Sequence, residues 1–137
     1  MRSNSDQKKK YKILLFLFAI GLIASIILHS PWLTELCGGS NSGCTAVENS
    51  GYKQTLGVEN SLLGIITFVI LIAITLSQIL TPHKNKELII NLGTIAIAIA
   101  GVYFISLQFV IIKATCRYCM VVDLISIASL GVYFRYR

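Results

Sequence analysis

The stretch LIINLGTIAIAIAGVYFISLQFVII (residues 88–112) contains 25 residues and no Asp, Glu, Lys or Arg. An α-helix rises about 1.5 Å per residue, so about 20 residues are enough to cross the hydrocarbon core of a bilayer. This run exceeds that length. It therefore predicts a transmembrane helix rather than the buried helix of a soluble domain.

Three further apolar runs lie on either side of it, at residues 13–33, 62–80 and 116–134, with 21, 19 and 19 residues. Across the whole chain 55% of the residues are hydrophobic and only 13% are charged. We therefore predict an all-α membrane protein. It would be a bundle of four transmembrane helices that forms a single domain over residues 1–137, with a long outer loop at residues 34–61.

The basic residues predict the orientation of this bundle, because Lys and Arg in short loops stay on the cytoplasmic side of a membrane. Nine of the twelve lie at the two termini or between the second and third runs, namely Arg2, Lys8, Lys9, Lys10, Lys12, Lys84, Lys86, Arg135 and Arg137. Both termini are therefore expected in the cytoplasm. The net charge of +6 reflects this asymmetry, and the sequence has no basic, aromatic-rich patch that would indicate nucleic acid as a partner.

The predicted topology brings all four cysteines to the outer side. Cys37 and Cys44 lie in the first outer loop, and Cys116 and Cys119 stand where the fourth helix begins. An even number of cysteines on the outer face of a membrane is typical of an oxidising compartment, where disulfides form and persist. That compartment would be a bacterial periplasm or the lumen of the endoplasmic reticulum.

The two cysteine pairs differ in their surroundings. A Gly- and Ser-rich stretch, GGSNSG, separates Cys37 from Cys44, and such a composition allows the pair to move. Cys116 and Cys119 instead open a helix, whose free N–H groups and positive dipole end stabilise the thiolate that attacks disulfides. A Cys-x-x-Cys at this position provides one reactive thiol and a second that can resolve the bond it forms.

Other interpretations of the cysteines remain open at this point. Cys37 and Cys44 could form a static loop disulfide, and Cys116 and Cys119 could form a structural bridge, although a bridge across so few residues stabilises little. The four cysteines could also bind zinc tetrahedrally. Zinc is the least favoured, because oxidising compartments favour disulfides and the loop spacing is wide for a pair of zinc ligands.

On these residues the chain resembles the vitamin K epoxide reductase family of membrane thiol oxidoreductases. The resemblance rests on Cys37 and Cys44 after the first helix, on CTAVENSGYKQTLGVENSLLG (residues 44–64) and on CRYC (residues 116–119) at the start of the fourth helix. It extends from about residue 13 to residue 134. Another four-helix quinone oxidoreductase of the periplasm carries its Cys-x-x-Cys in the first outer loop, so the order of the motifs separates the two families.

The resemblance implies an electron relay that supports disulfide bond formation. A thioredoxin-fold protein of the periplasm or lumen, acting in trans, would reduce Cys37 and Cys44; Cys44 would exchange with Cys116, and Cys119 would reduce a quinone. The quinone could be ubiquinone, menaquinone, vitamin K or its epoxide, and no metal is implied. The expected location is a bacterial inner membrane with the cysteines on the periplasmic side, or alternatively the membrane of the endoplasmic reticulum.

Two further residues are candidates for binding the quinone. Asn60 matches the family's asparagine, which donates a hydrogen bond to a quinone carbonyl, but it could equally cap the second helix. Asp123 follows Cys119 by one helical turn on the same face, where vertebrate members of the family have a tyrosine. A buried, protonated carboxyl could donate a hydrogen bond as the phenol does; alternatively, Asp123 could pair with Arg117 or Lys113.

The remaining predictions concern the outer loop and one polar residue. Residues 47–58 are too polar to span the membrane, but their apolar side chains predict a short amphipathic half-helix that caps the quinone pocket, as in the family. For Gln108 we predict only a hydrogen bond to another helix.

Two other functions compete with the oxidoreductase. A non-enzymatic membrane scaffold with two structural disulfides is the main alternative. A transporter or channel would need polar residues spread through its helices, and these runs consist almost entirely of Ile, Leu, Val and Ala.

Overall fold

The computed structural model of the chain describes residues 3–30, 32, 35, 43–52 and 54–137. Its long helices are α1 (Asn4–His29), α4 (Asn60–Leu80), α5 (Lys84–Ser106), which continues as the π-helix η1 (Leu107–Ile112), and α6 (Arg117–Arg135). Within the described residues four helices are long and apolar enough to cross a membrane. This confirms the prediction of a mostly helical protein with four helices that could span a membrane; the β1–β2 hairpin described below departs from the all-α expectation.

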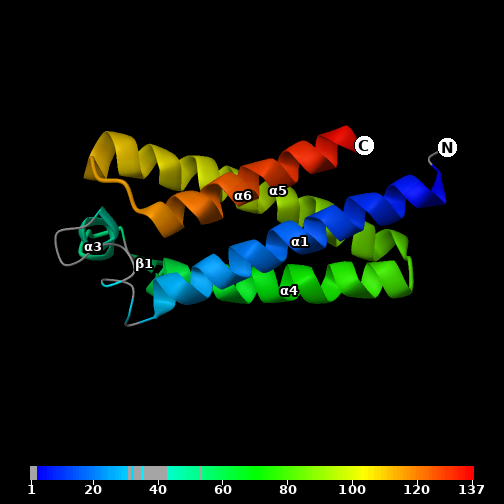
Figure 1. The fold of residues 1–137 in the computed structure, drawn as a ribbon, viewed down its shortest axis with the longest axis horizontal. Helices are drawn as coiled ribbons and strands as arrows, with labels where there is room; N and C mark the ends of the chain where they lie inside the picture. The colour runs from blue at the N-terminus through cyan, green and yellow to red at the C-terminus, as the bar shows by residue number, and fades with distance from the viewer. Residues whose placement is uncertain (1–2, 31, 33–34, 36–42, 53) are drawn as a thin grey trace.

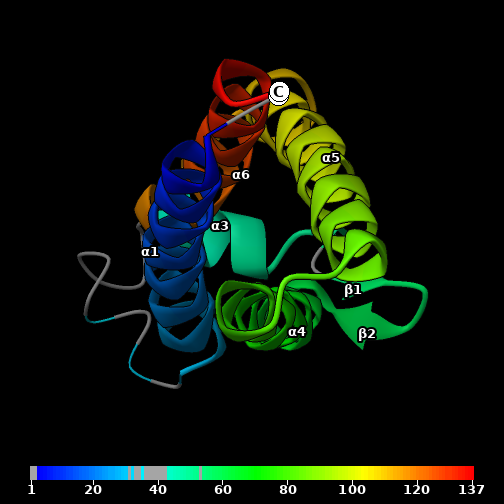
Figure 2. The same cartoon turned by 90° about the vertical axis from the view of Figure 1, so that its right-hand side faces the viewer.

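The four helices stand side by side and form a ring in the order α1, α6, α5, α4 (Figure 2). Contacts are extensive between α1 and α4, between α5 and α6, and between α1 and α6, but sparse between α4 and α5. Both ends of the chain lie at one end of the bundle, and helix α3 (Gly43–Glu48) lies at the other (Figure 1). The α4–α5 side is therefore the most loosely closed side of the ring.

Helix α1 starts well before its apolar run and ends earlier than expected. Ser3 caps it by accepting the N–H of Ser5 at 3.4 Å, and Lys and Gln, which follow in the sequence, favour helix without being apolar. At the other end, Ser30 has φ −73° and ψ 142°, the extended conformation that a following proline favours. The length of the apolar run therefore predicts the membrane span, whereas the capping residues determine where the helix begins and ends.

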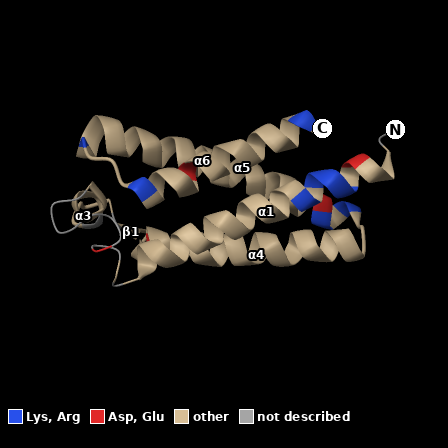
Figure 3. Ribbon diagram, in the orientation of Figure 1, with Lys and Arg blue, Asp and Glu red and all other residues tan. Residues whose placement is uncertain are grey.

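Basic residues gather at the end that holds the two chain ends and the connection between α4 and α5 (Figure 3). Lys10 is buried there, with its Nζ donating to Asn91 Oδ1 at 3.1 Å and lying 5.3 Å from the centre of the Tyr133 ring. A buried ammonium group needs such partners because desolvation is costly. Lys10 thus ties α1 to α5 and α6 at this end.

The half-helix predicted over residues 47–58 is wrong in its position. The short helix α3 ends at Glu48, and it is followed by a hairpin in which β1 (Gln54–Thr55) pairs with β2 (Val58–Glu59). Leu56 and Gly57 have φ values of 56° and 82°, as expected of the two-residue turns that join hairpin strands. The turn, which an apolar pattern does not indicate, breaks the expected helix.

Glycines allow the helices to approach closely in the middle of the bundle. A Cβ at Gly101 would lie 2.9 Å from the backbone oxygen of Asp123, and one at Gly64 would lie 2.8 Å from Ser25 Oγ. Both distances are below normal van der Waals contact. At Gly101 the neighbour is backbone, so a larger residue would have to move α6, whereas at Gly64 the Ser25 side chain would have to move. The close contact at Gly101 sets the position of Asp123 relative to α5.

We therefore expect Gly101→Ala to destabilise the protein by ~1–3 kcal/mol, because the added methyl group would push α5 away from the α6 backbone. Gly131→Ala is the matched control, since nothing lies within 4 Å of a Cβ there, and it should be neutral or stabilising by up to ~1 kcal/mol. Thermal unfolding in detergent measures both. Equal unfolding temperatures for the two variants would contradict the tight packing at Gly101.

Candidate active site

The Cys-x-x-Cys pair stands at the start of α6, as predicted. Cys116 is the N-cap, and its Sγ accepts the N–H of Cys119 at 3.3 Å. The two residues form a disulfide, with their Cα atoms 5.2 Å apart. Since the two sulfurs are bonded to each other, they are not available as zinc ligands in this state, and the described residues contain no group of three or more His, Cys, Asp or Glu that could hold a metal ion.

Cys44 lies in α3, beside the same end of α6. Its exposed fraction is 2% and that of Cys116 is 0%, and both belong to one buried cluster with Ile27, Val47 and Tyr118 around it. Cys44 is itself in a disulfide. Its predicted partner, Cys37, lies outside the described residues. The two cysteines that the relay would link, Cys44 and Cys116, are therefore neighbours.

The backbone at Gly43 explains how α3 comes so close to the start of α6. A Cβ built on Gly43 would overlap the backbone carbonyl oxygen of Thr115. Only glycine fits against this carbonyl, which belongs to the residue before Cys116. The glycine thus allows the peptide that carries Cys44 to reach the peptide that carries Cys116.

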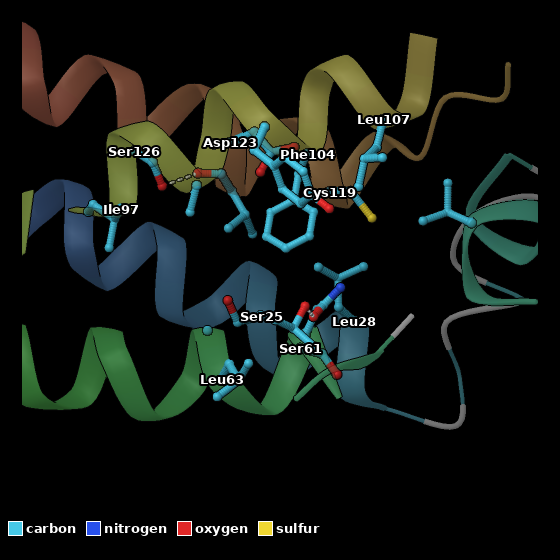
Figure 4. A pocket seen from close by; sticks show the side chains of 18 of the residues that line it. Ser25, Leu28, Ser61, Leu63, Ile97, Phe104, Leu107, Cys119, Asp123 and Ser126 are labelled. Carbon is cyan, nitrogen blue, oxygen red and sulfur yellow. Dashed lines mark hydrogen bonds between the residues drawn. The ribbon is translucent and has the colours of Figure 1, made fainter. Parts of the chain in front are cut away.

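A cavity of about 380 Å³ opens among the helices directly inside this end of the bundle. Figure 4 shows Cys119 and Asp123 of α6 on one side of it and Ser25, Ser61 and Leu63 on the other. Asn60 also lines it. Four of the residues considered in the sequence therefore meet at one cavity, whose wall is otherwise mostly apolar: Asn60, Gln108, Cys119 and Asp123. Its further lining includes Leu28, Phe68, Ile97, Phe104, Leu107 and Val122.

Asn60 is held by the hairpin and does not cap α4. Its Oδ1 accepts the hydroxyl of Thr55 at 2.6 Å, and its Nδ2 donates to the backbone oxygen of Tyr52 at 2.7 Å. The N-cap of α4 is Glu59, whose side chain makes no capping hydrogen bond. The helix-cap interpretation of Asn60 is therefore wrong, and the amide keeps one N–H beyond those bonds.

Asp123 is buried, with an exposed fraction of 4%. Its Oδ2 accepts a hydrogen bond from Gln108 Nε2 at 3.1 Å. Among the described residues it forms no ion pair, so the interpretation in which Asp123 pairs with Arg117 or Lys113 is wrong. A carboxyl group held in this way, without a cation, is costly to bury in ionised form.

Gln108 is the residue whose importance the sequence did not reveal. It is 2% exposed, lies in η1, and its Oε1 accepts the backbone N–H of Cys116 at 3.0 Å. It therefore joins the disulfide-bearing start of α6 to Asp123, in a π-helical segment of the kind often found at functional sites. An amide within a run of Leu, Phe, Val and Ile was the one indication available.

The sequence profile of the Vitamin K epoxide reductase family matches residues 12–134 of the 137-residue chain. The chain belongs to this family. Its members are oxidoreductases, which agrees with a disulfide at the rim of a membrane-embedded cavity. No curated protein matches the chain. As a member of the vitamin K epoxide reductase family, the protein has a membrane redox function in which disulfide chemistry takes part.

The burial of Cys44 beside Cys116 generates a test by cross-linking. In a Cys37→Ala/Cys119→Ala variant only Cys44 and Cys116 remain, and we expect mild oxidation to join them rapidly. Adding Gly43→Ala should slow this reaction about tenfold, because overpacking at such a contact costs about 1–3 kcal/mol.

Gly51→Ala, added to the same background, serves as the control, since nothing lies within 4 Å of a Cβ at that position. The fraction of cross-linked protein against time, read on a non-reducing gel, distinguishes the variants. Equal rates for Gly43→Ala and Gly51→Ala would show that the contact with Thr115 does not position Cys44.

Proposed function

We propose that the protein is a quinone-dependent protein-dithiol oxidoreductase that regenerates the oxidant for disulfide formation outside the cytoplasm. The observation that carries this proposal is the different location of the two sulfurs at the start of α6. Cys116 is fully buried beside Cys44, whereas Cys119 lines the cavity together with Asn60 and Asp123. One sulfur can thus exchange with the outer loop while the other faces a bound acceptor.

In the proposed relay the Cys37–Cys44 disulfide takes two electrons and two protons from a thioredoxin-fold partner, whose own two thiols become a disulfide. The Cys44 thiolate then attacks the Cys116 sulfur, forms a Cys44–Cys116 bond and releases the Cys119 thiolate. Cys37 attacks Cys44 in turn, which restores the loop disulfide and releases Cys116. Each exchange conserves the number of S–S bonds.

The last step would pass these electrons to the quinone. Cys119 attacks the ring, and Cys116 resolves the adduct by forming the Cys116–Cys119 disulfide again. The two thiols lose two electrons and two protons, and the quinone gains them and becomes the quinol. The start of α6 favours Cys119 as the attacking group, because helix N–H groups and the positive end of the dipole stabilise a thiolate.

The cavity suits a small apolar ring with polar groups at its edge. Its volume of about 380 Å³ lies within the range of ligand pockets, about 300–1,000 Å³. Asn60 and Asp123 would donate hydrogen bonds to the quinone oxygens. Leu63 of α4 and Tyr103 of α5 line the cavity and are also exposed on the outer surface, which would allow a lipid-soluble substrate to arrive from the membrane.

The distribution of charges supports a proposal for the compartment. The end of the bundle that carries most basic residues would face the cytoplasm, and Cys44, Cys116 and Cys119 lie at the opposite end (Figures 1 and 3). We therefore propose the inner membrane of a bacterium, with the cysteines at the periplasmic side, or alternatively the membrane of the endoplasmic reticulum. Helix α3 and the β1–β2 hairpin would cover the mouth of the quinone pocket.

Quinone reduction by the purified protein tests this function. With a reduced thioredoxin-like protein as electron donor, we expect turnover by the wild type and none above background by Cys119→Ala. Cys37→Ala should also lose turnover with the protein donor but keep it with a small dithiol, which can reduce the Cys116–Cys119 disulfide directly. Unchanged turnover in Cys119→Ala would end the proposal, and a static scaffold would show no quinone reduction with any donor.

A second measurement tests the role of Asn60. We expect Asn60→Leu to raise the KM for the quinone about tenfold, because the hydrogen bond that Asn60 would donate to a quinone oxygen is lost. Asn85→Leu makes the same chemical change at the opposite end of the bundle and should leave the KM unaltered. A KM equal to that of the wild type in Asn60→Leu would remove this residue from the quinone site.

A further inference from the structure

Gln108 accepts three hydrogen bonds from the segment that connects η1 to α6. Its backbone oxygen accepts the N–H groups of Lys113 and Ala114, the latter at 3.2 Å. Its side-chain Oε1 accepts the N–H of Cys116 at 3.0 Å. One buried residue therefore sets the path of the peptide that delivers Cys116 to the start of α6.

The bond to Cys116 also decides which way the Gln108 amide points. A backbone N–H can only donate, so the atom that faces Cys116 must be the amide oxygen. The NH₂ group of the same amide then faces Asp123, with Nε2 lying 3.1 Å from Oδ2. Since an NH₂ group can only donate, Oδ2 of Asp123 must accept.

This polarity determines where a proton on Asp123 resides. With Oδ2 accepting from Gln108, the proton of the neutral acid is more stable on Oδ1, because a carbonyl oxygen accepts hydrogen bonds better than a hydroxyl oxygen does. Among the described residues no other group bonds to the Asp123 carboxyl, and Asp123 lines the cavity with Cys119. A buried carboxyl group without a cationic partner is far cheaper to bury as the neutral acid.

We propose that Gln108 is a positioning residue that orients the Asp123 carboxylic acid so that its proton, on Oδ1, points at the quinone oxygen. The inference rests on the proposed function, which it deepens. Because the same amide holds the Cys116 backbone, it also keeps the acid at a constant distance from the sulfur pair. A proton that Asp123 gives to the quinone is replaced by one released from the cysteine thiols, so two protons still reach each quinone.

Gln108→Leu removes the donor to Asp123 Oδ2, so nothing fixes the acid proton on Oδ1. It also removes the acceptor of the Cys116 N–H, and reduction of the Cys116–Cys119 disulfide by a small dithiol measures that separate effect. We expect the KM for the quinone to rise about tenfold, as for the loss of a hydrogen bond. A quinone KM equal to that of the wild type would overturn the proposal.

Gln78→Leu is the matched control. Gln78 is also a buried glutamine, and its Oε1 likewise accepts a backbone N–H, that of His83 at 2.9 Å. It lies at the opposite end of α4 and does not line the cavity. This variant makes the same chemical change and should keep the wild-type KM and kcat.

Asp123→Asn keeps the proposal testable if Gln108→Leu does not fold. Gln108 would donate to the oxygen of the introduced amide and turn the NH₂ group of that amide toward the cavity. The quinone KM should then stay within about twofold of the wild type, because the hydrogen bond is kept, while kcat falls because an amide does not release a proton. A KM as high as that of Asp123→Leu would show that the side chain is not oriented as proposed.

Infrared spectroscopy provides a readout that does not depend on turnover. The C=O band of the Asp123 acid, assigned by its disappearance in Asp123→Asn, should move to higher frequency in Gln108→Leu, because Nε2 no longer donates to the carbonyl oxygen. An unmoved band would overturn the proposal. If the band moves but the wild-type protein reduces no quinone, the positioning of Asp123 is upheld and the proposed function fails.

Discussion

Hydrocarbon offers no hydrogen bonds, so a polar group inside the bundle is costly unless it finds its partner within the protein. Most hydroxyl groups do so within their own helix: Thr94 donates to the oxygen of Ile90, Ser126 to that of Val122 and Ser129 to that of Ile125. The bonds that join different helices lie toward the ends of the bundle. Lys10 binds Asn91 near the chain termini, and Gln108 binds Asp123 near the Cys116–Cys119 disulfide.

This constraint explains why the site is built from few residues. A polar side chain is costly in such a bundle unless it is partnered, and the partners of Asp123 and Asn60 fix their orientation. Gln108 holds the first and the hairpin holds the second, through Thr55 and Tyr52. The polar groups at the edge of the cavity are therefore oriented in advance, which lowers the cost of ordering them around a ligand.

In the proposed relay, the position of the cysteines separates two kinds of chemistry. Thiol exchange with the outer loop would need Cys116 beside Cys44, and Gly43 allows that approach. Chemistry with a ligand in the cavity would need Cys119, which lies one helical turn further along α6. The start of a single helix thus presents one sulfur to each side.

The sequence by itself determined the four spans, the cysteine pair at the start of a helix and the family, because span length follows from bilayer thickness and the motif is local. It also identified Asn60 and Asp123 as residues of interest. It did not show that residues 54–59 form a hairpin, that Asn60 does not cap α4, or that Gln108 joins Cys116 to Asp123. Those features depend on how each helix is rotated about its own axis and on how closely the helices approach. Apolar side chains suit both lipid and a helix neighbour, so an apolar run does not show which of its faces points into the bundle. Only the packing of the bundle brings Gln108 and Asp123 within hydrogen-bonding distance.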